Sequence, residues 1–236
     1  MGTLSGIIAA TPTHELTLPS NGKKIEYRPF LVKEEKILLI ASESKNEQEM
    51  YRAMRDVVGA CTFGKIDMTE SPMMDIEYLF LKIRSKSVGE TAKPTIKCSK
   101  CEKVNEVVVD LASLEPTKTP EHSNKIEISK DVILEMRYPR FLDIEKMQGM
   151  ETETLRMFKM MASCIDKIYT PKGTFITKDL EEGEVLDFLE NFTQTQFKKV
   201  SDFFETMPQL KKEVQYACSK CGNNEVITLR GAQDFF

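Results

Sequence analysis

Short stretches in which hydrophobic and polar residues alternate occur at four places in the chain. A period of two residues is typical of half-buried strands, and two such stretches joined by turn-forming residues predict a hairpin. The strand pairs are expected at 14–18 and 25–30, 95–97 and 106–111, 125–128 and 132–138, and 213–217 and 226–229. In the first pair, the turn-rich segment 20–23 joins the strands. We therefore expect four short antiparallel hairpins.

Between these hairpins, apolar residues recur every three or four positions, which predicts amphipathic helices. Helices are expected over 33–42, 46–61, 71–89 and 152–168, with two more beginning at Asp179 and Thr193. Asn46 is a candidate N-terminal cap for the second helix. Two capping boxes are also expected, at Asp179 with Glu182 and at Thr193 with Gln196.

The order of these elements predicts an α+β protein, a helical bundle with short antiparallel hairpins. Residues 115–123 form the best linker, because Pro116 and Pro120 stand among threonines there. We expect an N-terminal hairpin plus helices (1–92), a first cysteine knuckle (93–114), a hairpin plus helical subdomain (124–208), and a second knuckle with the C-terminal tail (209–236). The last segment is expected to pack with 93–114.

The composition is that of an ordinary soluble globular protein. Of the 236 residues, 41% are hydrophobic and 30% are charged. The 33 basic and 37 acidic residues give a net charge of -4, which lacks the positive field of a phosphate-backbone binder. Nucleic acid is therefore not expected as a partner. Membrane insertion is not expected either, because no apolar run approaches the roughly 20 residues that cross a bilayer.

We expect neither a signal peptide nor a lipid anchor at the start of the chain. Residues 1–12 lack a basic region, and Gly6 stands where a myristoylation motif has serine or threonine. The six cysteines should then lie in a reducing cytoplasm. Closely spaced thiols in that compartment bind metal more often than they form disulfides.

Four of the cysteines form two pairs with metal-ligand spacing, Cys98/Cys101 and Cys218/Cys221. Both pairs read Cys-Ser-Lys-Cys, and each is followed by Asn-Glu-Val, at 105–107 and 224–226. A gap of two residues lets both thiolates face one metal ion, and Gly222 permits the left-handed backbone that often follows such a turn. The lysine inside each pair, Lys100 or Lys220, should lower the pKa of the thiols.

One tetrahedral Cys₄ zinc site is the economical arrangement of these four thiols, because four sulfurs close the coordination shell. Residues 102–217 separate the pairs, against about 15–20 residues in the usual zinc ribbon. We therefore expect a zinc ribbon built from two sequence-distant knuckles, with a subdomain inserted between them. Three alternatives stay open: unmetallated turns, an iron site of four sulfurs, and zinc shared between two chains.

The sequence shows no catalytic site, and we expect that the protein is not an enzyme. A catalytic zinc keeps an open position and commonly has a histidine or carboxylate ligand, but His14 and His122 lie beside neither pair. The common nucleotide-binding and hydrolase motifs are missing. Cys61 and Cys164 fall within apolar stripes and are expected in the core.

The last two residues, Phe235 and Phe236, are candidate partner-binding residues. A chain end with two aromatic side chains either enters a core or docks on a partner, and the sequence leaves both alternatives open.

Two segments carry a family resemblance. The stretch 78–90, followed by the first Cys-Ser-Lys-Cys, and the ending 229–236, Leu-Arg-Gly-Ala-Gln-Asp-Phe-Phe, resemble the baseplate hub proteins of T-even-like contractile-tailed bacteriophages. The resemblance covers most of the chain, from 28–30 to the last residue. It implies a late structural protein of tail assembly that binds other baseplate hub and tail proteins.

The resemblance also implies a place, the host cytoplasm during assembly and then the virion tail baseplate. It leaves open whether the protein is a virion component or an assembly chaperone that departs, and whether it forms oligomers. Two other functions compete with it. A zinc-ribbon nucleic-acid-binding or transcription-type module would need a basic surface near the metal, and a zinc-dependent hydrolase would need a ligand other than cysteine.

Overall fold

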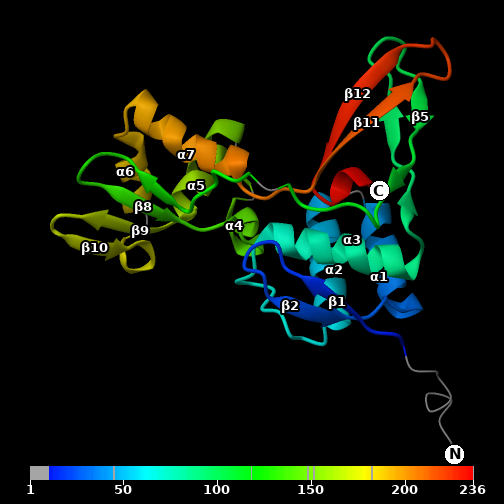
Figure 1. Ribbon diagram of the computed structural model, residues 1–236, viewed down its shortest axis with the longest axis horizontal. Helices are drawn as coiled ribbons and strands as arrows, with labels where there is room; N and C mark the ends of the chain where they lie inside the picture. The colour runs from blue at the N-terminus through cyan, green and yellow to red at the C-terminus, as the bar shows by residue number, and fades with distance from the viewer. Residues whose placement is uncertain are drawn as a thin grey trace, which may run out of the picture. The chain divides into compact units, whose positions relative to one another are not determined.

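The computed structural model describes residues 11–44, 46–117, 119–147, 149–150, 152–181 and 183–235 (Figure 1). The described residues form seven α-helices and twelve short strands, and the strands pair antiparallel, so the fold is α+β as the sequence predicts. No helix in these parts of the chain is both long and apolar enough to span a bilayer. The prediction about a signal peptide or lipid anchor concerns residues 1–10, which lie outside the described ones.

The chain divides into two compact units. The first unit comprises Met1–Met68, Met74–Pro116 and Leu210–Phe236, and the second comprises Thr69–Met73 and Thr117–Gln209. The second unit is therefore inserted into the chain of the first.

The first unit combines three helices with four separate strand pairs. Its elements are β1 (His14–Thr17), β2 (Lys24–Tyr27), α1 (Val32–Ser44), α2 (Glu47–Cys61), α3 (Met73–Ser87), β3 (Thr91–Ala92), β4 (Thr95–Lys97), β5 (Val104–Glu106), β6 (Val109–Asp110), β11 (Lys211–Ala217) and β12 (Asn224–Arg230). The strands pair as β1-β2, β3-β6, β4-β5 and β11-β12. Fully buried residues of α2 and α3, Val57, Ile76, Leu79 and Ile83, supply much of its core.

The second unit is a four-stranded antiparallel sheet with helices. Its elements are β7 (Lys125–Glu127), β8 (Ile133–Met136), α4 (Phe141–Lys146), α5 (Glu153–Ser163), β9 (Ile165–Thr170), β10 (Gly173–Ile176), α6 (Glu184–Glu190) and α7 (Gln194–Thr206). The strand order is β10-β9-β8-β7. Leu134, Ile165, Leu189, Val200 and Phe203 belong to one hydrophobic cluster, so the sheet and the helices share a core.

Two helix starts confirm the predicted caps. Helix α2 begins after Asn46, whose side chain accepts a hydrogen bond from the N–H of Gln48 at 2.9 Å. Helix α7 begins after Thr193, which forms the expected capping box with Gln196. The N–H of Gln196 donates to Thr193 Oγ1 at 3.3 Å, and the N–H of Thr193 donates to Gln196 Oε1 at 2.9 Å.

The helix expected over 152–168 is wrong in its second half, because α5 ends at Ser163 and β9 begins at Ile165. A register shift in the pairing of β9 with β8 leaves Asp166 as an extra, bulged residue. The bulge turns Ile165 and Ile168 to the same face, where they are only 1% and 5% exposed. A spacing of three residues, which is typical of a helix, is therefore produced here by an irregular strand.

The helix expected to begin at Asp179 is also wrong in its start. Asp179 ends a short 3-10 turn that begins at Thr177, and α6 begins at Glu184, after Gly183. The φ angle of Gly183 is 95°, in the left-handed region that favours glycine. Helix α6 thus begins at a glycine with left-handed backbone and not at a side-chain cap. Glu182, the expected second half of the capping box, lies outside the described residues.

A buried ion pair connects β2, α1 and the end of α2 in the first unit. Arg28, which directly follows β2, donates to Glu34 at 3.0 Å and to the carbonyl of Pro29 at 2.9 Å. Glu34 also accepts the N–H of Leu31 at 2.7 Å, and the N–H of Arg28 donates to the carbonyl of Cys61 at 3.0 Å. Burial raises the pKa of Glu34, but Arg28 and the Leu31 N–H outweigh it and lower that pKa.

The second unit repeats this arrangement with β8, α4 and the end of α5. Arg137, which directly follows β8, donates to both oxygens of Asp143 at 2.6 and 2.8 Å and to the carbonyl of Tyr138 at 3.2 Å. Asp143 also accepts the N–H of Arg140 at 2.8 Å, and the N–H of Arg137 donates to the carbonyl of Cys164 at 2.8 Å.

The same module therefore occurs once in each unit. It consists of a hairpin, an arginine directly after it, a helix with a buried carboxylate in its first turn, and a second helix that ends at or directly before a buried cysteine. The inward-facing strand residues also correspond, Ile25 and Tyr27 in β2 and Leu134 and Met136 in β8. The two copies differ in the first helix, since α1 has 13 residues and α4 has 6.

Candidate metal centre

The first cysteine knuckle, 98–103, is the turn between β4 and β5. The N–H of Cys98 donates to the carbonyl of Lys103, and the N–H of Glu102 donates back to the carbonyl of Cys98, both at 2.9 Å. Glu102 has a φ of 57°, which is uncommon for a residue other than glycine. These bonds hold Cys98 and Cys101 on one side of a tight turn.

The second knuckle, 218–223, is the turn between β11 and β12 and has the same backbone. The N–H of Cys218 donates to the carbonyl of Asn223 at 2.8 Å, and the N–H of Gly222 donates to the carbonyl of Cys218 at 2.9 Å. Gly222 has a φ of 68°, so the left-handed conformation expected from the sequence is confirmed. Glycine adopts this conformation without strain, whereas the first knuckle places Glu102 there.

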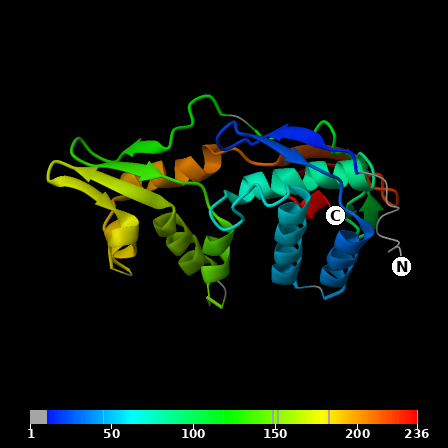
Figure 2. The same ribbon diagram turned by 90° about the horizontal axis from the view of Figure 1, so that it is seen from below.

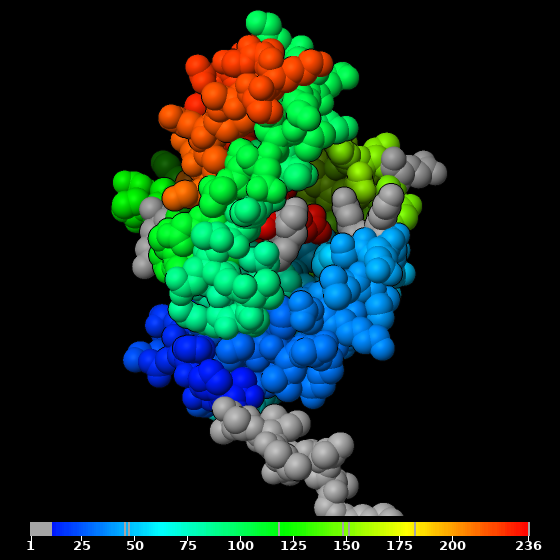
Figure 3. Space-filling model, turned by 90° about the vertical axis from the view of Figure 1, so that its right-hand side faces the viewer, coloured from blue at the N-terminus to red at the C-terminus, as the bar shows by residue number. Residues whose placement is uncertain are grey.

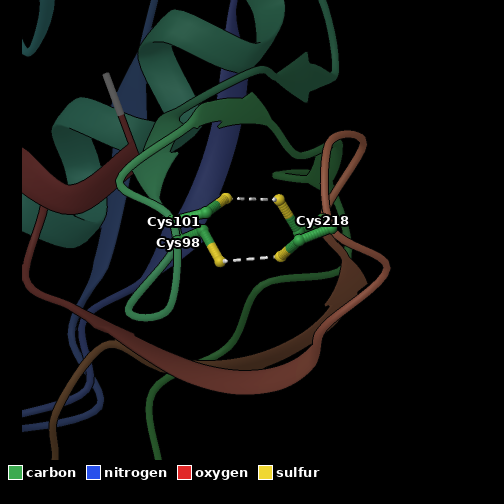
Figure 4. A group of neighbouring side chains, drawn as sticks. Cys98, Cys101 and Cys218 are labelled. Atoms are coloured by element: carbon green, nitrogen blue, oxygen red, sulfur yellow. Dashed lines mark hydrogen bonds between the residues drawn. The ribbon is translucent and has the colours of Figure 1, made fainter.

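The two knuckles lie together in the first unit. Figure 3 shows the orange-red surface of the β11–β12 hairpin against the green surface of residues 91–110. Cys98 and Cys101 face the second pair across a small gap (Figure 4). The Sγ atoms of Cys98 and Cys221 are 3.7 Å apart, those of Cys101 and Cys218 are 3.5 Å apart, and all four lie within 4.8 Å of one another.

These distances fit a tetrahedral metal site. A disulfide would bring two sulfurs to about 2.05 Å, much closer than any of these pairs. Four sulfurs at about 2.3 Å from one central ion, at tetrahedral angles, are separated by about 3.8 Å. The four thiols are therefore arranged as a metal ion would need them, and the sulfur-only ligand set suits zinc or iron.

Backbone N–H groups set the acidity of Cys218. The N–H groups of Cys221 and Lys220 lower the pKa of the Cys218 thiol to about 6. Backbone amides have this effect here, whereas the sequence suggested the lysine ammonium groups. For Cys101, the N–H of Lys103 lowers the pKa, but burial and hydrogen bonds to the other three cysteines outweigh it and raise the pKa to about 12.

Asn105 of β5 binds the second knuckle through its side chain. Its Oδ1 accepts both the N–H and the hydroxyl of Ser219 at 2.9 Å, and its Nδ2 donates to the sulfur of Cys218 at 3.6 Å. The same Nδ2 donates to the carbonyl of Lys103 at 2.8 Å. Asn105 is 7% exposed, so its own side chain is largely shielded from water.

Glu225 of β12 binds the first knuckle in the same way. Its Oε1 accepts the N–H of Ser99 at 3.1 Å, the hydroxyl of Ser99 and the thiol of Cys98 at 3.8 Å. Its Oε2 accepts the hydroxyl of Tyr216 at 2.7 Å. Ser99 and Tyr216, with Asn223, lower the pKa of Glu225.

Asn105 and Glu225 thus form a reciprocal clamp between the knuckles. Each is the fourth residue after the second cysteine of its own pair, and each binds the serine that follows the first cysteine of the opposite pair. The Asn-Glu-Val repeat does not reveal this correspondence. It aligns Asn105 with Asn224, which lies one residue closer to its cysteine pair than Asn105 does. Counting from the cysteines would have found it.

Replacing Asn105 with alanine is expected to loosen the clamp. The change removes the three hydrogen bonds that join Asn105 to Ser219 and Cys218, and each such bond contributes about 0.5–1.5 kcal/mol. Thermal unfolding of the metal-loaded protein should show this loss. The matched control is Asn224→Ala, which removes an exposed asparagine from the same sequence repeat. Equal melting temperatures for the two variants would contradict the role assigned to Asn105.

The other candidate residues lie away from the cysteine cluster. His14 is in β1, with its ring centroid 5.5 Å from that of Tyr27. His122 is in the second unit, where its Nδ1 bonds Thr206 at 2.9 Å and its Nε2 bonds Tyr138 at 3.1 Å, and burial lowers its pKa. Both histidine nitrogens of His122 are thus already engaged within that unit.

Cys61 and Cys164 are fully buried, as predicted for core residues. Burial raises the pKa of Cys61 to about 11 and that of Cys164 to about 12. Among the residues that the structure describes, the cluster of metal-competent side chains is the group of four cysteines.

Phe235 lies in the core of the first unit. It is 0% exposed and is thus not available to a partner. The turn before it depends on Gly231, whose φ is 63° and whose missing Cβ would lie 3.0 Å from Glu77. Burial raises the pKa of that Glu77 carboxyl to about 7. Phe236 lies outside the described residues.

The fold and the site define the class of protein. It is an α+β protein in which one hairpin precedes the inserted unit, another follows it, and the two hairpins meet at four cysteine sulfurs. The chain belongs to the family described as T4 bacteriophage base plate protein, whose sequence profile matches residues 11–236. No curated protein and no solved structure matches the chain. The resemblance to T-even-like baseplate proteins is therefore confirmed, and the protein is a phage baseplate protein.

Proposed function

We propose that this protein is a structural or assembly component of the baseplate hub, that it acts by binding other hub and tail proteins, and that one structural zinc ion holds its first unit together. The observation that carries the proposal is the meeting of four cysteine sulfurs within 4.8 Å. Two hairpins that are far apart in the sequence supply them, so a metal there would join the two ends of the unit.

The donor set supports a structural role for the metal. Four thiolates complete a tetrahedral shell and leave no position for a substrate or a catalytic water. Both histidines lie elsewhere, and the carboxylate of Glu225, which accepts the Cys98 thiol at 3.8 Å, also accepts hydroxyl and amide donors. This agrees with the non-enzymatic role that the baseplate family suggests.

The hub assignment rests on sequence likeness in two segments, 78–90 and 229–236. It is more specific than the family match, which names the baseplate but not the hub. The family implies a component of the virion tail that interacts with other tail proteins. Assembly in the host cytoplasm before incorporation follows from that role. The cysteine centre would serve it by fixing the shape that partners recognise, since a structural metal contributes folding free energy directly.

A nucleic-acid-binding role is the less favoured alternative. The net charge of -4 does not attract phosphates, and the family match points to the baseplate. Binding to DNA or RNA that weakens steeply with salt would support this alternative.

Metal analysis of the purified native protein tests the proposal. We expect about one zinc ion per chain, and X-ray absorption should show sulfur neighbours at about 2.3 Å with no nitrogen or oxygen in the shell. A pull-down from infected cells should recover hub proteins with it. Iron in place of zinc would overturn the choice of metal, and a nitrogen or oxygen ligand would overturn the closed structural site. Recovery of tail proteins outside the hub would overturn the hub assignment alone.

A further inference from the structure

Helix α1 exposes an unusual number of aliphatic side chains. Val32, Leu39 and Ile40 are 80%, 59% and 57% exposed. Single exposed hydrophobic residues are common on protein surfaces, but several on one helix are not. Within α1, only Glu34 and Ala41 are buried. Figure 2 shows α1 and α2 in blue, side by side and directed away from α3, so α2 covers one side of α1 and leaves another open.

The fold does not need the exposed part of α1. In the second unit, the same module is complete with α4, which has 6 residues, whereas α1 has 13. In both copies the buried carboxylate that binds the arginine lies in the first turn of the helix, so the module needs only the start of that helix. The added C-terminal half of α1 carries Leu39 and Ile40 and contributes only Ala41 to the core. A role outside the core of the unit explains this extension.

The charges on this face complement a second copy of the same helix. Lys36, Leu39, Ile40 and Glu43 are spaced by three, four and seven residues, so they share one face of α1. The positive end of the face lies toward the N-terminus and the negative end toward the C-terminus. Among the described residues, no ion pair is formed by Lys36 or by Glu43.

We propose that two copies of the chain associate through α1, with the helices antiparallel about a two-fold axis between Leu39 and Ile40. In this register Leu39 of each copy meets Ile40 of the other, and Lys36 meets Glu43. A two-fold axis makes both contacts occur twice, which is the usual form of a homodimer interface.

The dimer is weak and depends on concentration. One helix pair buries less than the roughly 800 Å² per partner of a stable interface. The inference is independent of the metal and of the hub assignment, because it concerns a surface on α1 alone.

Sedimentation equilibrium of the full-length, metal-loaded protein tests the dimer. Wild type should show a reversible monomer–dimer equilibrium, and Leu39→Ser with Ile40→Ser should weaken it by about tenfold or more. The melting temperature should fall only slightly, because both side chains are more than half exposed and serine is only a weaker helix former. The matched control is Leu155→Ser with Met157→Ser, which removes an exposed apolar pair, 40% and 43% exposed, from α5.

Charge exchange tests the antiparallel register. Lys36→Glu or Glu43→Lys alone should weaken the dimer several-fold, because each change opposes two like charges across the axis. Both changes in one chain should restore the wild-type constant. A parallel pairing would leave the single variants at the wild-type constant and would overturn the register.

A wild-type protein that stays monomeric at every concentration would overturn the proposal. Equal weakening by the Leu155/Met157 control would overturn it as well, because the association would then not be specific to α1.

Discussion

Cys218→Ser is expected to abolish stable metal binding and to destabilise the first unit while the second unit stays folded. Structural zinc contributes apparent folding free energies of about 10–16 kcal/mol in small zinc-finger peptides. In this chain, the hydrophobic core and the clamp remain without the metal, so we expect a much lower first transition in calorimetry and not complete unfolding. The metal content of the variant should fall to background, and its assembly into baseplates should fail.

Cys164→Ala is the control for this experiment. It removes a buried thiol from the second unit, and Cys164 is not one of the four clustered cysteines. This variant should keep its full metal content and lose only the modest stability expected of a small cavity. A Cys218→Ser protein with wild-type metal content and melting temperature would show that the four sulfurs do not hold a metal together.

Glu34→Gln is expected to destabilise the first unit by about 3–5 kcal/mol, because it leaves the buried Arg28 guanidinium without a counter-charge. The side chains of this pair are only 13% and 4% exposed. Urea unfolding at neutral pH measures the loss. Asp143→Asn should cause a similar loss in the second unit, since Arg137 and Asp143 are 20% and 5% exposed there.

The Glu34 effect should depend on pH in a defined direction. The pKa of Glu34 is lower in the folded protein than the ordinary value of 4.5. Its ionised form therefore stabilises the fold fully above that ordinary value, and this contribution is lost as the pH falls through the lower folded pKa. The difference between wild type and Glu34→Gln should shrink on acidification.

An exposed ion pair of the same unit provides the control. Lys24 and Glu15 are 69% and 61% exposed, so Glu15→Gln should destabilise the protein far less than Glu34→Gln. If Glu34→Gln costs no more than this control, the buried pair does not organise the module as we infer.

The elements with local signals could be predicted from the sequence. The caps at Asn46 and Thr193 depend on residues within one turn, and both occur in the structure. The cysteine pairs carry their own turn geometry, so the expectation that all four would gather agrees with the cluster in the first unit. The sequence also predicted that the metal is zinc. The identity of the metal depends on chemistry that the spacing of the cysteines does not encode.

Features that depend on distant partners could not be predicted. The bulge at Asp166 exists because β9 pairs with β8, and it gives a strand the apolar spacing of a helix. The clamp pairs Asn105 with Ser219 and Glu225 with Ser99, and neither pairing has a local signal. The repeated module was missed because its two copies share an arginine, a carboxylate and a cysteine but few other residues.

The baseplate family suggests a structural role in the phage tail. Neither histidine lies at the cluster, and the sulfurs form a closed donor set. Surfaces that contact other tail proteins are therefore the next features to identify. The α1 face and the two paired hairpins are the first surfaces to test.

The insertion of the second unit delays the synthesis of the second cysteine pair relative to the first. The two ends of the insert are joined by hydrogen bonds between Thr117 and Gln209, including an N–H to carbonyl bond of 2.8 Å. At about 5–20 residues per second, synthesis of residues 102–217 takes on the order of ten seconds. During that time, Cys98 and Cys101 are present without Cys218 and Cys221. A nascent chain therefore exposes two of the four thiols to oxidation or to binding of an unrelated ion until residues 218–221 have been translated.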